Sequence, residues 1–278
     1  MFTTMVSVTE LAAHLDAPDW IVFDCRHDLA DTAAGRRAYA HSHIPGARFV
    51  HLDDDLSGPK TGANGRHPLP DPGKFCARLA ALGMRNDMQA VAYDASGGAY
   101  AARFWCMLRW VGHTRVAVLD GGWDAWLNAG SPVTAHAATA EPAAFSGAAR
   151  DITVDASFIA SRLGKPHPRV LDARSADRFR GENETLDSVG GHIPGAINRF
   201  FKNNLAADGR FKSAGELKNE FAELLGAQLP AQVVHQCGSG VTACHNLLAM
   251  EIAQLPGSKL YPGSWSEWCS DPRRPVAH

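Results

Sequence analysis

The chain has 278 residues, of which 45% are hydrophobic and 20% are charged. Single domains usually hold about 100 to 150 residues, so this length favours two domains. Lys and Arg total 27 against 29 for Asp and Glu, giving a net charge of −2, which argues against nucleic acid and anionic lipid as partners. The N-terminus has no basic start followed by an apolar run, and no long apolar stretch occurs elsewhere. We therefore expect an unexported protein without a membrane span.

The cysteines are scattered and form no CxxC pair, which argues against a zinc ribbon and against a dense disulfide framework. We expect reduced thiols in the cytoplasm, with no bound metal. There are six: Cys25, Cys76, Cys106, Cys237, Cys244 and Cys269.

The sequence repeats itself, which points to two similar domains. A stretch rich in Ala and Pro, without apolar periodicity, separates the copies. We predict a first domain at 1–131, a linker at 132–150 and a second domain at 151–278. The repeated segments are IVFDCR (21–26) and VLDAR (170–174), HIPGA (43–47 and 192–196), and LDGGWDAW (119–126) and LYPGSWSEW (260–268).

Short apolar or β-branched runs alternate with amphipathic stretches along both copies. This alternation predicts an α/β fold in which each copy is a parallel sheet flanked by helices. Ligands bind such sheets beyond the carboxyl ends of the strands, here the loops after Tyr93 and Gln236. The predicted strands are 21–24, 90–93, 116–119, 170–172 and 232–235, and the clearest predicted helices are 73–82 and 213–225.

Cys237 stands where a predicted buried strand ends and a loop of small residues leads into a helix. Gly238 and Gly240 let the backbone fold closely around the sulfur, so that loop amides and the helix N-terminus can point at it. Such donors favour a reactive thiolate and would also hold the terminal sulfur of a persulfide. The alternative is that Cys237 is a small buried hydrophobe. Cys244, about two helical turns further on, is either a resolving thiol or an inert helix residue.

Together these motifs resemble the rhodanese family. They are the Asp-x-Arg strand end, HIPGA, the cysteine loop and Gly-x-Trp-x-x-Trp, and the tandem arrangement covers essentially the whole chain. The loop CGSGVTA resembles that of the 3-mercaptopyruvate sulfurtransferase branch, whereas the thiosulfate branch has basic residues where Gly238 and Ser239 stand. The resemblance implies two rhodanese-like domains and a cytoplasmic enzyme without a cofactor. It also implies a Cys237 persulfide that passes sulfur to a thiol such as thioredoxin, or to cyanide, and releases pyruvate.

The N-terminal copy has Ala95 where Cys237 stands in the alignment of 93–103 with 235–245. Without a thiol it cannot carry sulfur, so we expect this copy to be inactive.

A 3-mercaptopyruvate donor carries a carboxylate, which calls for a guanidinium near the cysteine. The resemblance assigns this role to Arg178, while Arg174 suits a structural ion pair. The second arginine of the branch is missing from ENETLDSVGG at 182–191. Arg199 could replace it from a neighbouring loop or be structural, and Arg180 is a weaker substitute.

The resemblance also assigns Asp53 and Ser239 to a proton relay, and His67 to the pocket. Asp53 belongs to a DDD run that could equally be solvated surface. Ser239 and Thr242 could simply cap the helix and bond within the loop. In the mechanism we expect, the loop amides that hold the persulfide belong to Gly238, Gly240, Val241 and Thr242.

Three alternatives remain from the sequence. The nearest is a thiosulfate sulfurtransferase using the same cysteine. A cysteine phosphatase would need an arginine six residues after the cysteine, where Ala243 stands. A non-catalytic binding module would lack the cysteine in both copies, which fits the N-terminal copy alone.

Overall fold

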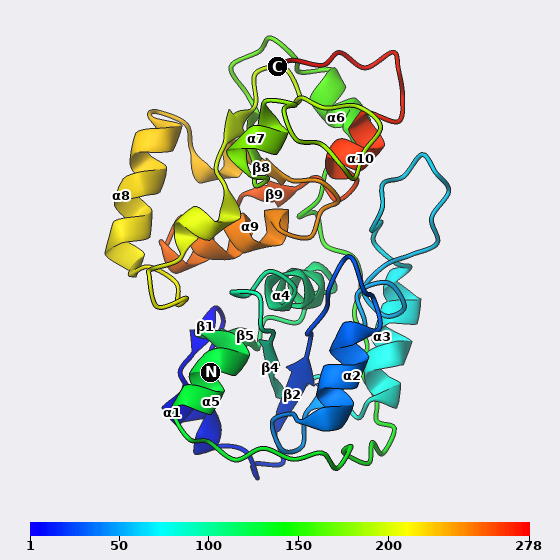
Figure 1. Ribbon diagram of the computed structural model, residues 1–278, viewed down its shortest axis with the longest axis vertical. Coiled ribbons are helices and arrows are strands. Elements are labelled where there is room, and N and C mark those ends of the chain that lie inside the picture. The colour runs from blue at the N-terminus through cyan, green and yellow to red at the C-terminus, as the bar shows by residue number, and fades with distance from the viewer. The chain divides into compact units, whose positions relative to one another are not determined.

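The computed structural model describes residues 1–278, which divide into two compact units (Figure 1). Each unit contains one copy of the repeat. The segment 59–69 groups with the second unit, although the sequence-based boundaries place it in the first domain. Unit 1 comprises Met1–Gly58, Pro70–Asp151 and Ala207–Arg210, and unit 2 comprises Pro59–Leu69, Ile152–Ala206 and Phe211–His278.

Unit 1 is built on a five-stranded parallel sheet, which confirms the predicted fold class. Its predicted strands at 21–24, 90–93 and 116–119 are β2, β4 and β5. β1 and β3 have two residues each, too short for a period to show in the sequence. In spatial order the strands are β1 (Met5–Val6), β5 (Val116–Leu119), β4 (Gln89–Tyr93), β2 (Trp20–Asp24) and β3 (Arg48–Phe49).

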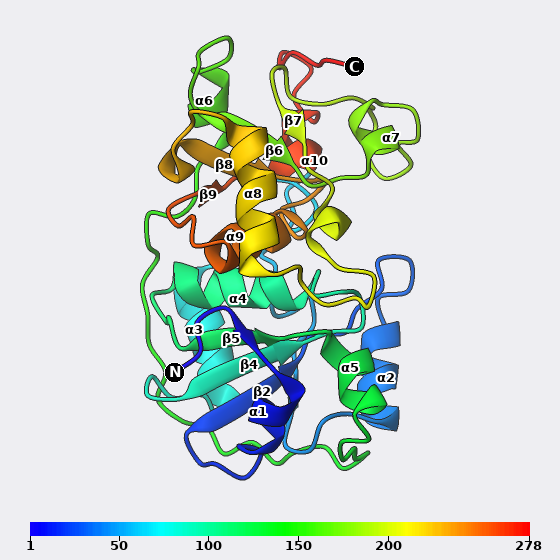
Figure 2. The same ribbon diagram turned by 90° about the vertical axis from the view of Figure 1, so that its left-hand side faces the viewer.

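Helices cover both faces of this sheet (Figure 2). On one face, Val22 and Val91 pack with Leu11 of α1 and Trp126 of α5. On the other, Phe23 meets Phe104 of α4, with ring centroids 4.5 Å apart. Successive side chains of β2 point to opposite faces of the sheet and therefore pack into two different cores. The helices are α1 (Val8–Ala12), α2 (Ala34–His41), α3 (Pro72–Ala81), α4 (Ala101–Trp110) and α5 (Gly122–Asn128).

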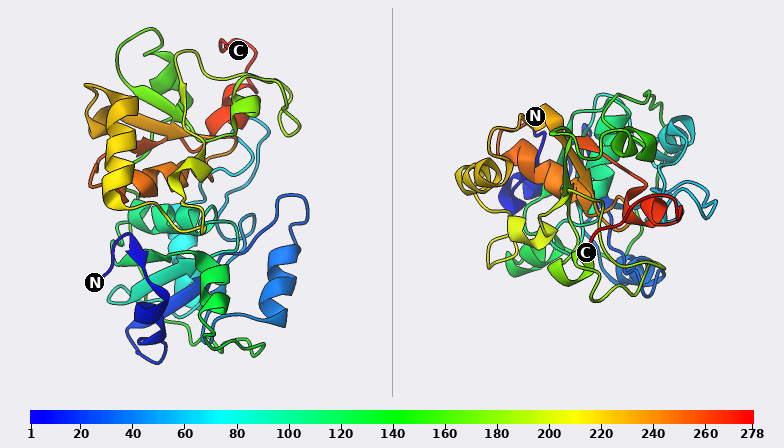
Figure 3. Two further views of the ribbon diagram at one scale, coloured as in Figure 1. Left: turned by 60° about the vertical axis from the view of Figure 1, so that its left-hand side comes forward. Right: turned by 90° about the horizontal axis from the view of Figure 1, so that it is seen from above.

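Unit 2 repeats the plan with four parallel strands. Val170 and Val234 face Trp265 and Trp268 of α10 on one side of the sheet. On the other side α8 and α9 lie next to each other (Figure 3, left), and Phe221 of α8 belongs to their shared core. In spatial order the strands are β7 (Ile197–Asn198), β6 (Arg169–Asp172), β8 (Val233–Gln236) and β9 (Lys259–Leu260).

The predicted helix at 213–225 is α8, which starts at a capping box: Ser213 accepts the amide N–H of Glu216, whose carboxylate accepts that of Ser213. None of the helices is long and apolar enough to pass through a bilayer. The helices of unit 2 are α6 (Ala156–Ala160), α7 (Ala176–Phe179), α8 (Ala214–Leu225), α9 (Ala243–Ile252) and α10 (Ser264–Trp268), with 3-10 turns η1 (Phe201–Asn204) and η2 (Pro230–Gln232).

The segment 132–150 has no helix or strand of its own and belongs to unit 1. Its backbone is bonded to that unit at several points: Thr134 forms an antiparallel bridge with His43, and the amide of Ala143 donates to the carbonyl of Ala80 at 2.8 Å.

Candidate active site

Cys237 directly follows β8, a strand with a neighbour on each side, and the loop after it leads into α9. The start of α10 fixes its backbone: the amide of Cys237 donates to Oγ of Ser264 at 3.1 Å, and its carbonyl accepts the amide of Trp265 at 2.9 Å. The sulfur is buried and accepts the amide N–H of Gly240 at 3.1 Å. The loop therefore aims a backbone donor at the sulfur, as a thiolate acceptor requires.

Gly240 is a position that only glycine fits. Its φ is +78°, and a Cβ there would lie 2.2 Å from the carbonyl oxygen of Pro262. Any other side chain would push the loop away from that backbone and turn the amide from the sulfur.

The equivalent loop of unit 1 shows what such a ring of amides can hold. The Asp94 carboxylate accepts four backbone N–H groups, at distances from 2.7 to 2.9 Å. Burial raises the pKa of Asp94, while these donors oppose that shift. The donors belong to Ser96, Gly98, Tyr100 and Ala101.

The backbone register corrects the prediction that Ala95 stands at the cysteine position. Asp24 pairs with Tyr93 as Asp172 pairs with Gln236, and the Asp94 carbonyl accepts the amide of Trp123 as the Cys237 carbonyl accepts that of Trp265. Asp94 is therefore the counterpart of Cys237, and unit 1 has a carboxylate, not a thiol, in this loop.

His67 and Ser239 meet: Nδ1 of His67 lies 2.7 Å from Oγ of Ser239, and both side chains are buried. His67 reaches this place because the segment 59–69 belongs to unit 2. Ser266 holds the segment there, since its Oγ accepts the amide of Arg66 at 3.0 Å and its own amide donates to the carbonyl of Gly238 at 2.9 Å. The imidazole and the hydroxyl form a short path along which a proton can move beside the cysteine.

Two guanidinium groups flank the cysteine loop. A Cβ added to Gly238 would lie 2.9 Å from Nη2 of Arg66 and 3.4 Å from Nη2 of Arg178. Arg178 donates to Glu184, with Nη2 2.8 Å from Oε2, and Arg66 forms an ion pair with Asp187 through Nη1. The side chains of Arg178 and Arg66 are 20% and 28% exposed, respectively. They offer paired planar donors to an anion beside Cys237.

Arg66 also borders a cavity of about 280 Å³ within unit 2. Leu186, Asp187, Ser266 and Cys269 contribute to its walls. The cavity has the size for a small molecule and carries a guanidinium on its wall, which suits a small anion.

The other arginines predicted from the sequence have different surroundings. Arg174 pairs with Asp172 at 2.7 Å and with Glu184 at 3.4 Å, and lies over the Trp265 ring. Burial by itself would lower the pKa of Arg174. The carboxylates of Asp172 and Glu184 outweigh burial and raise this pKa, and the charge of Cys237 acts in the same direction. Arg174 therefore keeps a fixed cation near the sulfur as part of a structural ion pair.

Arg199 is held within unit 2 by an ion pair with Glu220 at 2.6 Å and a bond to Oδ1 of Asn204 at 3.0 Å, and it packs over the Phe221 ring. These contacts favour the structural role over the substrate-binding one. Arg180 is an exposed partner of Glu182.

The remaining candidates also have definite places. Val241 and Thr242 lead into α9, where their carbonyls accept the amides of Cys244 and His245. Cys244 is buried and its thiol donates to the carbonyl of Gly240 at 3.3 Å. Asp53 belongs to unit 1, where it follows β3 and lies beside His27 and His51.

Sequence reasoning missed Arg66, Asp187 and Asp94. Arg66 stands next to His67, so the signal was adjacent, but nothing in the sequence shows that it pairs with an acid 121 residues away. Asp94 directly precedes Ala95, and an acid just before a loop of small residues indicates that its carboxylate accepts the loop amides.

Comparison with known proteins agrees with this geometry. The model of the rhodanese-like domain matches residues 7–129 and 155–271. A Pseudomonas aeruginosa protein named as a probable 3-mercaptopyruvate sulfurtransferase is 47% identical over 276 residues, covering 98% of this chain and 97% of the relative. The thiosulfate sulfurtransferase of Bos taurus is 34% identical, covering 96% and 92%.

Two solved structures agree as well. The 3-mercaptopyruvate sulfurtransferase of Leishmania major superposes with a TM-score of 0.84 at 31% identity, over 96% of this chain and 74% of that one. The 3-mercaptopyruvate sulfotransferase SseA of Escherichia coli gives 0.82 at 30% identity, over 95% and 99%.

Proposed function

We propose, from the premise that this chain belongs to the rhodanese family, that it is a 3-mercaptopyruvate sulfurtransferase in which Cys237 carries the sulfur. The observation that carries this proposal is the amide of Gly240 aimed at the Cys237 sulfur, in a loop whose counterpart in unit 1 holds a carboxylate with four amides. A persulfide anion on Cys237 has the same need for backbone donors that the Asp94 carboxylate has.

In the proposed reaction the Cys237 thiolate attacks the donor sulfur. The new S–S bond forms as the carbon–sulfur bond breaks, and its electron pair leaves on pyruvate as the enolate. The proton of the donor thiol ends on the enolate carbon, so that the products are pyruvate and the Cys237 persulfide anion. Ser239 and His67, whose Oγ and Nδ1 are 2.7 Å apart, are proposed to pass that proton. The assignment of Asp53 to the relay stays a prediction.

Arg178 and Arg66 are proposed to hold the carboxylate of the donor. Their guanidinium groups lie on the same side of the loop, beside Gly238. Arg66 then supplies the charge for which Arg199 was considered, because Arg199 is held by Glu220 and Asn204. The amides of Gly238, Gly240, Val241 and Thr242 are proposed to hold the persulfide.

A thiol such as that of thioredoxin then removes the outer sulfur and restores the thiolate. None of the six cysteines forms a disulfide in the structure. This fits the reducing cytoplasm in which we propose that the enzyme works. The closer relative named above is of the 3-mercaptopyruvate type, at 47% identity against 34% for the thiosulfate sulfurtransferase.

Intact mass measurement tests the proposal. Incubation with 3-mercaptopyruvate should add one sulfur atom, located in the peptide that holds Cys237, and release one pyruvate. Cys237→Ser should gain no sulfur. Cys244→Ser is the matched control, since serine can keep the donor to the Gly240 carbonyl, and it should gain sulfur like the wild type. Sulfur uptake by Cys237→Ser would refute the site, and a higher kcat/KM with thiosulfate would refute the donor.

A further inference from the structure

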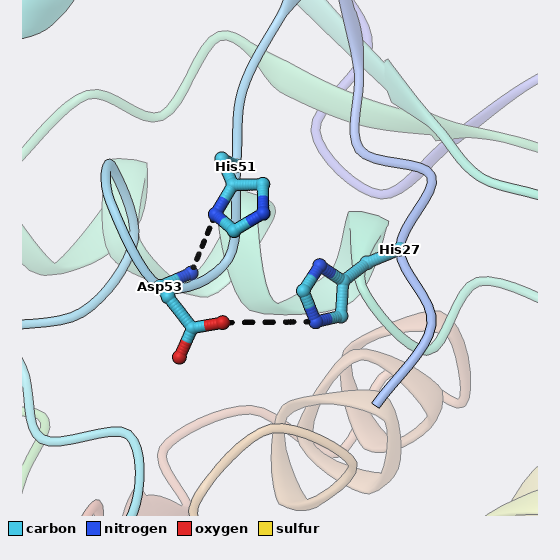
Figure 4. Close-up of side chains that lie close together, drawn as sticks. All are labelled: His27, His51 and Asp53. Atoms are coloured by element: carbon cyan, nitrogen blue, oxygen red, sulfur yellow. Dashed lines mark hydrogen bonds and ion pairs between the residues drawn. The ribbon is translucent and has the colours of Figure 1, made fainter. Parts of the chain in front are cut away.

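Two histidines and an aspartate meet in unit 1, outside the cysteine loop. His27 follows β2, while His51 and Asp53 follow β3, and these two strands are parallel neighbours in the sheet. One ring nitrogen of each histidine and one carboxylate oxygen of Asp53 all lie within 4.8 Å of one another (Figure 4). We propose that these three residues form a binding site for a divalent transition-metal ion, with Zn²⁺ as the representative.

His27 is the first reason. Its side chain is 1% exposed, and both ring nitrogens are buried without a hydrogen-bond partner. Buried polar groups nearly always form hydrogen bonds or bind an ion, so a bound ion would explain why this imidazole is buried here. Nε2 of His27 lies 3.9 Å from Oδ2 of Asp53, which is too far for a hydrogen bond. Two ligands bonded at about 2.1 Å to one tetrahedral ion lie roughly 3.4 Å apart, so a small side-chain movement would fit an ion between these atoms.

His51 is oriented as a ligand by a hydrogen bond on Nε2, the ring nitrogen that would not bind the ion. Its Nε2 lies 2.8 Å from the carbonyl oxygen of Thr32, and because a carbonyl only accepts, Nε2 carries the proton. The lone pair is then on Nδ1, the atom nearest to Asp53. A carbonyl that orients the far nitrogen of a metal-binding histidine is a regular feature of metal sites. The backbone amides of Asp53 and Asp54 approach Nδ1 at 3.2 and 3.3 Å, and these long bonds are the contacts that an ion would replace.

The second copy of the repeat shows that the fold does not require this cluster. The two copies have the same backbone register at this point, because the amide of Val50 donates to the Asp24 carbonyl as the amide of Arg199 donates to that of Asp172. Unit 2 forms the same strands without any of the three ligands. Its equivalent residues are Ser175, Phe200 and Lys202.

The donor set selects the class of ion. Two imidazole nitrogens and one carboxylate oxygen suit zinc and its first-row neighbours, whereas Mg²⁺ and Ca²⁺ prefer oxygen ligands throughout. The Asp53 side chain is 24% exposed, so the cluster is open on that side. An ion bound here could therefore complete its coordination with water. The proposal concerns binding. It shares Asp53 with the predicted proton relay, so its tests measure metal binding in the Cys237→Ser background, where no sulfur is transferred.

Cobalt(II) titration of the full chain tests the site, after treatment with a chelator. The Cys237→Ser background is used so that the reactive thiol cannot bind the ion. One equivalent should bind with the visible spectrum of nitrogen and oxygen ligands, and Zn²⁺ should displace it. His27→Phe keeps the buried ring but removes both nitrogens, and should weaken binding by at least about tenfold. His41→Asn, an exposed histidine of the same unit, should bind as the background does.

Asp53→Asn gives a second reading, since it removes the charged ligand and keeps the backbone amide that contacts His51. Weakened binding by both variants, with melting temperatures kept, supports the site. Unchanged binding by His27→Phe, a sulfur-to-cobalt charge-transfer band, or no bound cobalt in the background would each overturn it.

Discussion

Nδ1 of His67 lies 2.7 Å from Oγ of Ser239, although 172 residues separate them in the chain. If this pair passes the proton between donor and product, removing either member should slow the chemical step more than it weakens donor binding. We expect His67→Gln and Ser239→Ala each to lower kcat for pyruvate release by about 100-fold, with a small change in KM.

The double variant should lose little more than either single variant, because residues that act as one unit are not additive. His167→Gln, an exposed histidine of the same unit, should keep full activity. Independent, multiplying losses in the double variant would mean that the two residues do not share a proton path.

The sequence predicted the central strands because buried apolar runs are long enough there to be recognised. It also predicted that Cys237 follows a buried strand and that loop amides point at its sulfur, and in the structure Cys237 follows β8 and accepts the amide of Gly240. It could not show that the segment 59–69 belongs to unit 2, because which domain a loop packs against depends on contacts distant in sequence. For this reason the adjacent Arg66 was missed, and Arg199 was considered in its place.

Arg66 gives the next prediction. A charge-assisted hydrogen bond to a donor carboxylate contributes about 1.5 to 3 kcal/mol, so Arg66→Gln should raise KM for 3-mercaptopyruvate by about 10-fold to 100-fold. Steady-state kinetics of pyruvate release measures this. Arg180→Gln is the matched control, since Arg180 is an exposed arginine of the same unit with an acidic partner, and its KM should not change. A KM for Arg66→Gln equal to that of the wild type would limit Arg66 to its ion pair with Asp187.

Asp94 should be important for stability rather than for chemistry. Its carboxylate accepts four backbone N–H groups in a buried loop. Asp94→Asn keeps the size but replaces one acceptor oxygen by a donor, which leaves buried amides unsatisfied. We expect a loss of about 2 to 4 kcal/mol in the free energy of unfolding, measured by urea denaturation. Asp16→Asn, at an exposed position of the same unit, should change it by less than about 0.5 kcal/mol. An equally stable Asp94→Asn would show that the loop amides do not need an anion.

His235 should make the free energy of unfolding depend on pH. It lies in β8, fully buried, with Nε2 3.1 Å from Oγ of Ser258, and burial lowers its pKa to about 3 from an ordinary value near 6.5. Between these values the unfolded chain binds a proton that the folded chain does not, so the free energy of unfolding falls as the pH falls through this range. At pH 5 the loss relative to pH 8 is roughly 2 kcal/mol for this residue.

His235→Gln can keep the contact to Ser258 and cannot titrate, so its urea midpoint should change less between pH 8 and pH 5 than that of the wild type. His136→Gln, an exposed histidine, should follow the wild type at both pH values. Equal pH dependence in wild type and His235→Gln would mean that His235 binds protons equally in the folded and unfolded chains, so that burial does not lower its pKa.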